Sequence, residues 1–263
     1  MKEKIAIVTG ASKGIGFEVA KMLSAENYKV YGLSRTPSPC DTVEWVFCDV
    51  MCIDSVKQAF QKIIEECGRV DVLICNAGIG ISGASEFTPE PDYSRQMDLN
   101  LLGSVRCVQQ VISVMREQSG GKIVFISSLA AIFPLPFQSF YSASKAALNA
   151  FSDALGIELK PFGIETGVVM LNDVKTEFTD NRGKIQAGDD IYQGRIHSSV
   201  EKMEKSERTG MTPEQVAQAV RKILNRRHLP SHKIVGLSNE FLGFLYRVLP
   251  TNLMLKLLAK IYG

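Results

Sequence analysis

The sequence predicts an α/β fold in which one doubly wound parallel sheet of about seven strands carries helices on both faces. Apolar runs of strand length alternate with amphipathic runs of helix length along most of the 263 residues. The composition is that of a globular chain, with 45% hydrophobic and 22% charged residues. The chain shows no internal repeat and no low-complexity tract. We therefore expect a single domain that spans residues 1–263.

Each expected strand is a short apolar run. The first, at residues 5–9, reads IAIVT and follows a charged N-terminus. Six further runs share this character, at residues 29–33, 43–47, 70–74, 122–126, 165–169 and 233–237. Because helix-length segments separate the runs, consecutive strands are expected to be parallel.

Residues 179–212 form a polar excursion from this alternation, with glycines at 183, 188 and 194 and no sustained period. A long irregular segment in a compact domain is usually a lid or a substrate-binding loop, although a mobile surface insertion is the alternative. A helix is expected to follow it, because Thr212 suits the N-cap, Pro213 the first helical position and Gln215 the capping box.

The C-terminal segment, residues 241–263, is apolar and amphipathic, and Pro250 divides it. The proline and the charges argue against a membrane-spanning helix. A helical stripe opposite Lys256 and Lys260 is formed by Leu253, Met254, Leu257, Leu258 and Ile261. We expect this stripe to pack on its own subunit or to close a substrate pocket, with peripheral contact to a membrane surface as the alternative.

Charge and cysteine content exclude several classes of protein. Thirty Lys and Arg residues against 28 Asp and Glu residues give a formal charge of +2, which is too small for a nucleic-acid binder. The six cysteines include no C-x-x-C pair, and the N-terminus carries no apolar export signal, so we expect reduced thiols and a cytoplasmic location. The three histidines have no metal-ligand spacing, so no metal site is expected.

A glycine-rich loop follows the first expected strand and precedes a helical segment. Its glycines are Gly10, Gly14 and Gly16, with the spacing G-x-x-x-G-x-G. Glycines between a strand and a helix let the backbone approach a pyrophosphate, whose charge the helix N-terminus stabilises. A plain turn would also use glycines, but the position between strand and helix favours a dinucleotide site.

Two basic residues indicate which dinucleotide binds. A fold that prefers NAD usually has Asp or Glu at the end of the second strand, where it binds the ribose 2′-hydroxyl. Here that position reads Ser34-Arg35-Thr36, and Lys13 lies inside the glycine loop. Both cations suit a 2′-phosphate, so the sequence favours NADP(H) over NAD(H), unless they are merely solvated surface residues.

Tyr141 and Lys145 lie at i and i+4 at the start of an apolar-periodic helix, so they share one face. A tyrosine with its ordinary pKa near 10 is a poor base at neutral pH, whereas a nearby ammonium favours the phenolate. The pair therefore indicates acid/base chemistry at a phenol. Because tyrosine and lysine are common, the spacing alone is weak evidence.

Taken together, these motifs resemble the short-chain dehydrogenase/reductase family, in its compact subgroup, over nearly the whole chain. The resemblance depends on motifs that occur in the order of the family: Thr9-Gly10-x-x-x-Gly14-x-Gly16, Asp49-Val50, Asn76-Ala77-Gly78, Asn100, Ser128 and Tyr141-x-x-x-Lys145. It implies a Rossmann-like sheet and a hydride transfer between a nicotinamide cofactor and a carbonyl or alcohol.

The resemblance also implies roles for individual residues. Tyr141 would be the general acid in reduction and the base in oxidation, and Lys145 would bind the nicotinamide ribose and lower the pKa of Tyr141. Ser128 would hydrogen-bond the substrate oxygen, and Asn100 would hold a water of a proton relay. The cofactor contacts would come from Gly10, Ser12, Lys13, Gly14, Ile15, Gly16, Arg35, Asp49, Val50, Asn76, Ala77, Gly78, Tyr141, Lys145, Val174 and Thr176.

One stretch departs from the family pattern. Where members generally have Pro-Gly ahead of Val-x-Thr, this chain reads Leu171-Asn172-Asp173 before Val174 and Thr176. Asparagine tolerates positive φ better than most residues do, so Asn172 is expected to keep the backbone path of the missing glycine.

The expected function is an NADP(H)-dependent oxidoreductase that interconverts a ketone and a secondary alcohol on a small, lipophilic substrate. The chain looks most like family members that act on hydroxysteroids or retinoids. A 3-ketoacyl-carrier reductase, a catalytically idle NADP-binding regulator and a nucleotide-sugar epimerase are alternatives. A homodimer or homotetramer is expected, because the helical segments 99–115 and 146–159 are apolar over more than one face.

Overall fold

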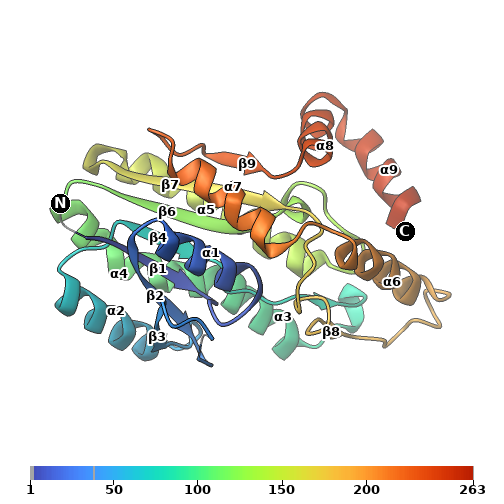
Figure 1. Cartoon of the computed structure of the whole chain (residues 1–263). Helices are drawn as coiled ribbons and strands as arrows, with labels where there is room; N and C mark the ends of the chain where they lie inside the picture. The colour runs from blue at the N-terminus through green and yellow to red at the C-terminus, as the bar shows by residue number, and fades with distance from the viewer. Residues whose placement is uncertain (1–2, 38, 263) are drawn as a thin grey trace.

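A computed structural model describes residues 3–37 and 39–262, and residues 1, 2, 38 and 263 of the expected domain lie outside it. Its main sheet has seven strands, all parallel, in the order β3-β2-β1-β4-β6-β7-β9 (Figure 1). Their bounds are β1 Lys4–Thr9, β2 Tyr28–Ser34, β3 Glu44–Phe47, β4 Val72–Cys75, β6 Gly121–Ser128, β7 Ile164–Leu171 and β9 His232–Ile234. The predicted α/β fold around a parallel sheet of about seven strands is thus confirmed.

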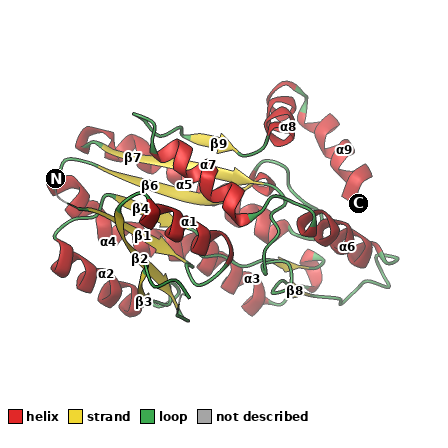
Figure 2. Ribbon diagram, viewed as in Figure 1, coloured by secondary structure: helices red, strands yellow, loops and turns green. Residues whose placement is uncertain are grey.

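Helices cover both faces of the sheet (Figure 2). On one face lie α1 (Gly14–Ala25) and α7 (Pro213–Leu224), and on the other lie α2 (Ile53–Cys67), α4 (Gly103–Glu117) and α5 (Ser139–Leu159). Successive strand residues alternate between the two faces: Ile5 and Ile7 of β1 belong to the core under α2, α4 and α5, whereas Ala6 and Val8 belong to the core under α1 and α7. A sheet buried on both faces explains why its strands read as continuous apolar runs.

The order of the strands reverses beside β1. The chain runs from β1 outward to β3 on one side, then returns to β4 and continues through β6 and β7 to β9 on the other. Ligands in open parallel sheets bind at this reversal, outside the carboxyl ends of the strands. The loop after β1 and the loop after β4 meet there.

The remaining elements border that edge. They are β5 (Ile81–Ser82), α3 (Glu90–Met97), β8 (Gly183–Lys184), α6 (Arg195–Arg208), α8 (Leu237–Val248) and α9 (Thr251–Tyr262). β5 and β8 pair in parallel as a separate two-stranded sheet, which ties the segment after β7 to the loop after β4.

The polar excursion is more ordered than its sequence suggested, because it contains β8 and α6. The helix buries only Ile196, Ser199, Val200 and Met203, and one of these four is polar. So thin an apolar stripe is hard to detect by periodicity. The helix expected next is present as α7, and Thr212 and Gln215 form its capping box.

Two expectations at the C-terminal end need correction. The last strand was expected over residues 233–237, but β9 ends at Ile234 and α8 begins at Leu237, after Gly236 turns the chain at φ +97°. The expected apolar stripe of α9 is divided: Met254 and Leu258 are buried, whereas Leu253, Leu257 and Ile261 are exposed.

Candidate active site

The glycine loop joins β1 to α1 and needs glycine for steric reasons. Gly10 and Gly14 have φ of +67° and +56°, which side chains rarely adopt. A Cβ on Gly16 would collide with the carbonyl oxygen of Gly10 and with the side-chain nitrogen of Asn76. Among the described residues, no side chain caps the N-terminus of α1. The loop therefore leaves open the backbone cradle that a pyrophosphate would occupy.

Asn76 and Thr9 hold this loop against the end of β4. The Asn76 amide nitrogen Nδ2 donates to the carbonyl oxygen of Thr9 at 3.0 Å, and the Thr9 hydroxyl accepts from the backbone N–H of Ala77 at 3.1 Å. Asn76 was expected to line the cofactor ribose, and here its amide orders the glycine loop. Ser12 and Ile15 belong to the same loop, so the residues expected at the pyrophosphate lie together.

Asn100 lies in a π-helical turn, Asp98–Leu102, between α3 and α4. Such turns inside helices frequently mark functional sites. Asn100 is fully buried, and its Oδ1 accepts from the N–H of Ile79 at 2.8 Å while its Nδ2 donates to the Ile79 carbonyl at 3.0 Å. Nδ2 also donates to the Ser144 hydroxyl at 3.1 Å. The side chain thus joins the loop after β4 to the catalytic helix α5.

Gly78 separates Asn100 from Lys145. A Cβ on Gly78 would lie 3.2 Å from Asn100 Oδ1 and 3.7 Å from Lys145 Nζ. The absence of a side chain lets the lysine amine approach the loop after β4. Three residues that the sequence placed in different motifs therefore meet in one place.

Ser128 ends β6, and Tyr141 lies in the first turn of α5. The Ser128 hydroxyl accepts from the N–H of Ala130 at 3.1 Å. Burial raises the pKa of Tyr141 to about 12, although a hydrogen bond with the Ser128 side chain opposes the rise. We expected Lys145 to lower this pKa, but the opposing effects come from Ser128 and Arg182, and burial outweighs them. Tyr141 is consequently protonated at neutral pH and able to donate a proton.

Lys145 is buried one turn further along α5. Its Nζ donates to the carbonyl oxygen of Ile126 at 2.9 Å and lies 5.9 Å from the centroid of the Tyr141 ring. Burial lowers the pKa of Lys145 to about 8. A positive charge held beside the phenol at neutral pH suits proton transfer there.

The residues expected around the adenosine end lie at the ends of β2 and β3. Arg35, directly after β2, is exposed. Asp49 accepts from the N–H of Met51 at 3.0 Å, and the buried Val50 packs against Gly103 of α4. Lys13 lies in the glycine loop and forms an exposed ion pair with Glu177 at 2.7 Å.

The loop after β7 passes over the glycine loop. Thr176 lies against Gly14, because a Cβ on Gly14 would be 3.5 Å from the Thr176 methyl carbon. Val174 is buried and bridges to Met211. Asn172 does not adopt the positive φ for which its tolerance was invoked, so the residue makes no use of glycine-like backbone freedom. Strand-like pairing of Val174 with Met211 holds this loop instead.

A buried ionic cluster that sequence reasoning missed borders Tyr141. The ring of Phe178 lies 6.0 Å from that of Tyr141, and the Arg182 guanidinium lies 5.7 Å from the centroid of the Phe178 ring. Arg182 is 5% exposed and pairs with Glu207 of α6, which also accepts from the Thr179 hydroxyl at 2.7 Å. Arg182 carries a positive charge that lowers the Tyr141 pKa and Glu207 a negative one that raises it. The polar composition of residues 179–212 was the only signal, and it resembles a solvated surface.

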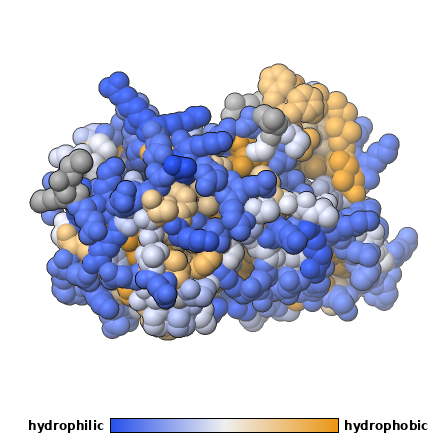
Figure 3. All heavy atoms as spheres, in the orientation of Figure 1, coloured by the Kyte–Doolittle hydropathy of each residue, from blue (hydrophilic) through white to orange (hydrophobic). Residues whose placement is uncertain are grey.

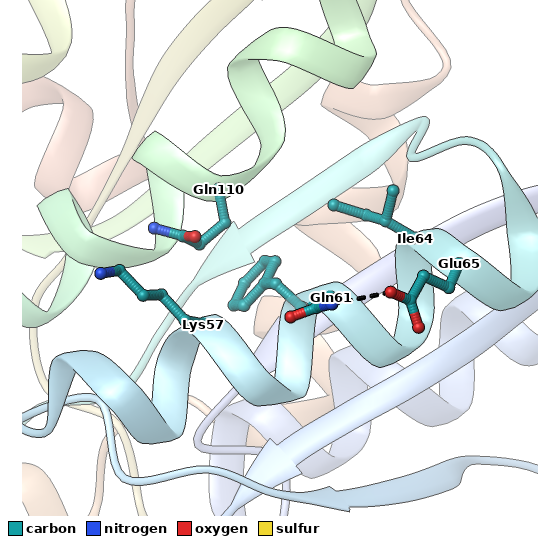
Figure 4. Close-up of a pocket in the computed structure, with 6 residues that line it drawn as sticks. Lys57, Gln61, Ile64, Glu65 and Gln110 are labelled. Carbon is teal, nitrogen blue, oxygen red and sulfur yellow. Dashed lines mark hydrogen bonds between the residues drawn. The ribbon is translucent and has the colours of Figure 1, made fainter.

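A pocket between α2 and α4 lies away from the catalytic and cofactor residues. It has a volume of about 330 Å³ and lies between α2 and α4, where Gln61 donates to Glu65 at 2.7 Å (Figure 4). Its other lining residues are Lys57, Phe60, Ile64 and Gln110. None of the expected catalytic or cofactor residues lines it, so it is separate from the site at the carboxyl ends of the strands.

Within residues 3–37 and 39–262, His, Cys, Asp and Glu side chains form no group of three that could hold a metal ion. In the same part of the chain, no helix combines the length and the apolar character needed to cross a bilayer.

Comparison with known proteins gives consistent results. Residues 4–187 match the sequence profile of the short chain dehydrogenase family. A 3-ketodihydrosphingosine reductase of Bacteroides thetaiotaomicron is 41% identical over 239 residues, which cover 90% of this chain and 89% of that protein. Human 17-beta-hydroxysteroid dehydrogenase type 1 is 31% identical over 197 residues, covering 68% of this chain and 60% of the relative. A short-chain dehydrogenase of Streptomyces avermitilis has a similar structure, with a TM-score of 0.84, 27% identity and 94% of each chain covered.

Proposed function

The chain belongs to the short-chain dehydrogenase/reductase family, and from this premise we propose that it interconverts a lipophilic ketone and its secondary alcohol with NADP(H) as cofactor. One observation carries the proposal. Ser128, Tyr141 and Lys145 converge where β6 ends and α5 begins, beside the glycine loop, with the phenol protonated and the amine buried. Such an arrangement can bind a carbonyl oxygen and protonate it.

The glycine cradle fits a dinucleotide, which when bound supplies or accepts the hydride. Ser128 and Tyr141 donate hydrogen bonds to the carbonyl oxygen of the substrate and so orient it. In reduction, Tyr141 gives its phenolic proton to that oxygen as charge develops there. Lys145, positive at neutral pH, stabilises the phenolate that remains. Asn100 holds α5 and the loop after β4 together through its hydrogen bonds to Ile79 and Ser144.

Support for NADP(H) comes from Lys13 and Arg35. Arg35 follows β2 and is exposed, so its guanidinium is available for a bidentate contact with a 2′-phosphate. The ion pair of Lys13 with Glu177 is exposed on both sides, and such pairs contribute only about 0–1 kcal/mol. Lys13 can therefore exchange Glu177 for a phosphate at little cost.

Support for a lipophilic substrate comes from the relatives and from the chain's own surface. The Bacteroides relative is named for a long-chain amino ketone, and the human relative for a steroid. On this basis we propose a long-chain ketone related to 3-ketodihydrosphingosine as the substrate class. The α8–α9 segment agrees with this, since its apolar surface adjoins the segment after Ser128.

Three other functions were open from the sequence. A nucleotide-sugar epimerase usually has a G-x-x-G-x-x-G loop, which differs from the G-x-x-x-G-x-G spacing of this chain. An idle nucleotide-binding regulator has no chemical need for Ser128, Tyr141, Lys145 and Asn100 together, so we set it aside. A 3-ketoacyl-carrier reductase would share all four residues, but such chains generally lack a tail like residues 241–263. Its substrate differs in having a thioester beside the ketone.

A substrate screen tests the proposal. NADPH oxidation would be followed by the absorbance of the reduced nicotinamide, with 3-ketodihydrosphingosine, a 3-ketoacyl thioester and a ketosteroid as substrates. We expect the highest kcat/KM with the long-chain amino ketone. Preference for the thioester would support the carrier reductase, and no turnover of any ketone or secondary alcohol would refute an oxidoreductase role.

A further inference from the structure

The last two helices carry an unusual share of the exposed apolar surface. Sixteen large apolar side chains are exposed in the described chain, and nine of them lie on α8 and α9. We call these nine the C-terminal patch: Phe241, Leu242, Phe244, Tyr246, Val248, Leu253, Leu255, Leu257 and Ile261. Figure 3 shows apolar surface gathered over this end of the molecule. Contiguous apolar surface of this kind marks a site of interaction.

The patch belongs to helices that are fixed to the domain. Met254 and Leu258 of α9 are buried, and the ring of Tyr246 in α8 packs edge-on against Phe133 with centroids 5.3 Å apart. At the start of α8, Asn239 Nδ2 donates to the Val235 carbonyl at 2.8 Å. Met254, Leu258 and the ring contact of Tyr246 therefore anchor the helix pair, while most of the patch is exposed to solvent, with Tyr246 and Leu255 at its border.

The charges around the patch indicate what covers it. Lys256 and Lys260 are the charged residues of α9, both are exposed, and each lies three residues after an exposed leucine, Leu253 or Leu257, so they border one side of the ridge of Leu253, Leu257 and Ile261. The acidic residue of α8, Glu240, is paired with Lys233. Two cations beside exposed leucines, with no unpaired acid on the described side chains of either helix, match anionic phosphate headgroups above hydrocarbon.

We propose that the C-terminal patch docks on an anionic lipid bilayer, with α8 and α9 lying in the plane of the interface. A second copy of the chain is the competing occupant. A symmetric contact through α9 would bring the lysines of two copies together with no acidic partner on that helix, which is unfavourable. A phospholipid surface offers both the negative charge and the apolar layer.

The position of the patch gives this docking a consequence, which rests on the proposed function. The segment 129–136 follows Ser128, and a cavity of about 620 Å³ lies between this segment and α9. Its apolar lining includes Ile132, Leu135 and Leu255. At the far end of α9, Lys202 of α6 donates to the Ile261 carbonyl at 3.4 Å. The docked face thus adjoins the segment that follows Ser128 and also α6, whose Glu207 pairs with Arg182, so a membrane-dissolved ketone would arrive on the side of the molecule that borders Tyr141.

Vesicle co-sedimentation of the full chain tests the proposal without any turnover. The probes are phosphatidylcholine vesicles with and without phosphatidylglycerol. We expect the protein to pellet with the anionic vesicles and to be released by salt. Phe241→Ser/Phe244→Ser should weaken partitioning by roughly tenfold or more per side chain, and Lys256→Gln/Lys260→Gln by about fivefold per lysine.

Matched control variants distinguish binding through the C-terminal patch from non-specific binding to vesicles. Ile191→Ser removes an apolar side chain that is 65% exposed in the substrate loop, and Lys57→Gln removes an exposed cation on α2. Both should partition as the parent does, and circular dichroism should show all variants folded. Absent parental binding, or equal binding by patch variants and controls, overturns the proposal. The proposal is also overturned if the parent forms an oligomer that the patch substitutions dissociate and if it does not bind to vesicles. Because NADPH reduction of a water-soluble ketone is assayed apart from binding, failure of docking and failure of the enzymatic function give different results.

Discussion

The amine nitrogen of Lys145 lies 5.9 Å from the centre of the Tyr141 ring and is held there by the carbonyl oxygen of Ile126. The two residues are one helical turn apart on α5. Burial changes their pKa values in opposite directions, so the phenol keeps its proton and the amine holds its own less tightly. This division suits a site that donates a proton from tyrosine in the direction of reduction.

Tyr141→Phe should abolish turnover while NADPH affinity remains within a few-fold of the parent. The substitution removes the exchangeable proton and leaves the ring that packs near Phe178. Stopped-flow or steady-state kinetics would measure turnover, and nucleotide fluorescence would measure binding. Activity close to that of the parent would show that another group is the acid.

Lys145→Met should stabilise the fold at neutral pH while it impairs catalysis. The folded-state pKa of about 8 lies below the ordinary value of 10.5, so the unfolded chain binds more protons between these values and stability rises with pH across that window. Below about pH 8 the buried ammonium lowers the free energy of unfolding by on the order of 3 kcal/mol. An uncharged methionine would not carry this penalty. Thermal melts from pH 7 to above pH 10 would show the advantage at the lower end of the range. A variant that melts below the parent at pH 7 would contradict the expectation, with exposed Lys57→Met as the control.

Arg35→Asp should reverse the cofactor preference. We expect the parent to use NADPH at least about tenfold more efficiently than NADH, since one charged contact of roughly 1.4 kcal/mol gives that factor. An acidic residue at the end of β2 repels the 2′-phosphate and accepts from a 2′-hydroxyl. Comparison of kcat/KM for both cofactors would measure the change, with Lys57→Asp as a charge control. Equal use of both cofactors by the parent would contradict the assignment.

Arg182→Met should raise KM for the ketone and lower the melting temperature, with little change in NADPH affinity. The substitution leaves the half-buried Glu207 without its cation, and breaking a fully buried pair typically costs about 3–5 kcal/mol, which is an upper bound here. Arg182→Met/Glu207→Gln should recover part of the stability, because no uncompensated charge remains. If the single variant kept the parental KM, Arg182 would not order the substrate side of the site.

Light scattering should detect a homodimer or homotetramer at micromolar concentration. The family resemblance implies that α4 and α5 form the main interface, and Ile157 of α5 is 77% exposed in the single chain. Ile157→Arg should shift the protein toward monomer. A parental monomer would contradict the expectation.

The sheet was predictable because its central strands are buried on both faces and therefore appear as apolar runs, whereas the edge strands β3 and β9 are more exposed. The glycine loop and the Tyr141–Lys145 pair were equally visible, since each depends on short-range spacing. The role of Arg182 could not be predicted from the sequence, because Phe178 and Glu207 create its environment through tertiary packing. Asn172 was misjudged for a related reason: the Val174–Met211 bridge, distant in sequence, fixes the loop path that local propensity was used to predict.

The small β5–β8 sheet has a consequence for the order in which the protein folds. Its strands are two residues each and join Ile81 to Gly183, across β6, α5 and β7. So few hydrogen bonds cannot offset the closure of so long a loop until the intervening sheet has formed. The nucleotide side of the site depends on the neighbouring strands β1 and β4 and can therefore fold first. The substrate side is completed last.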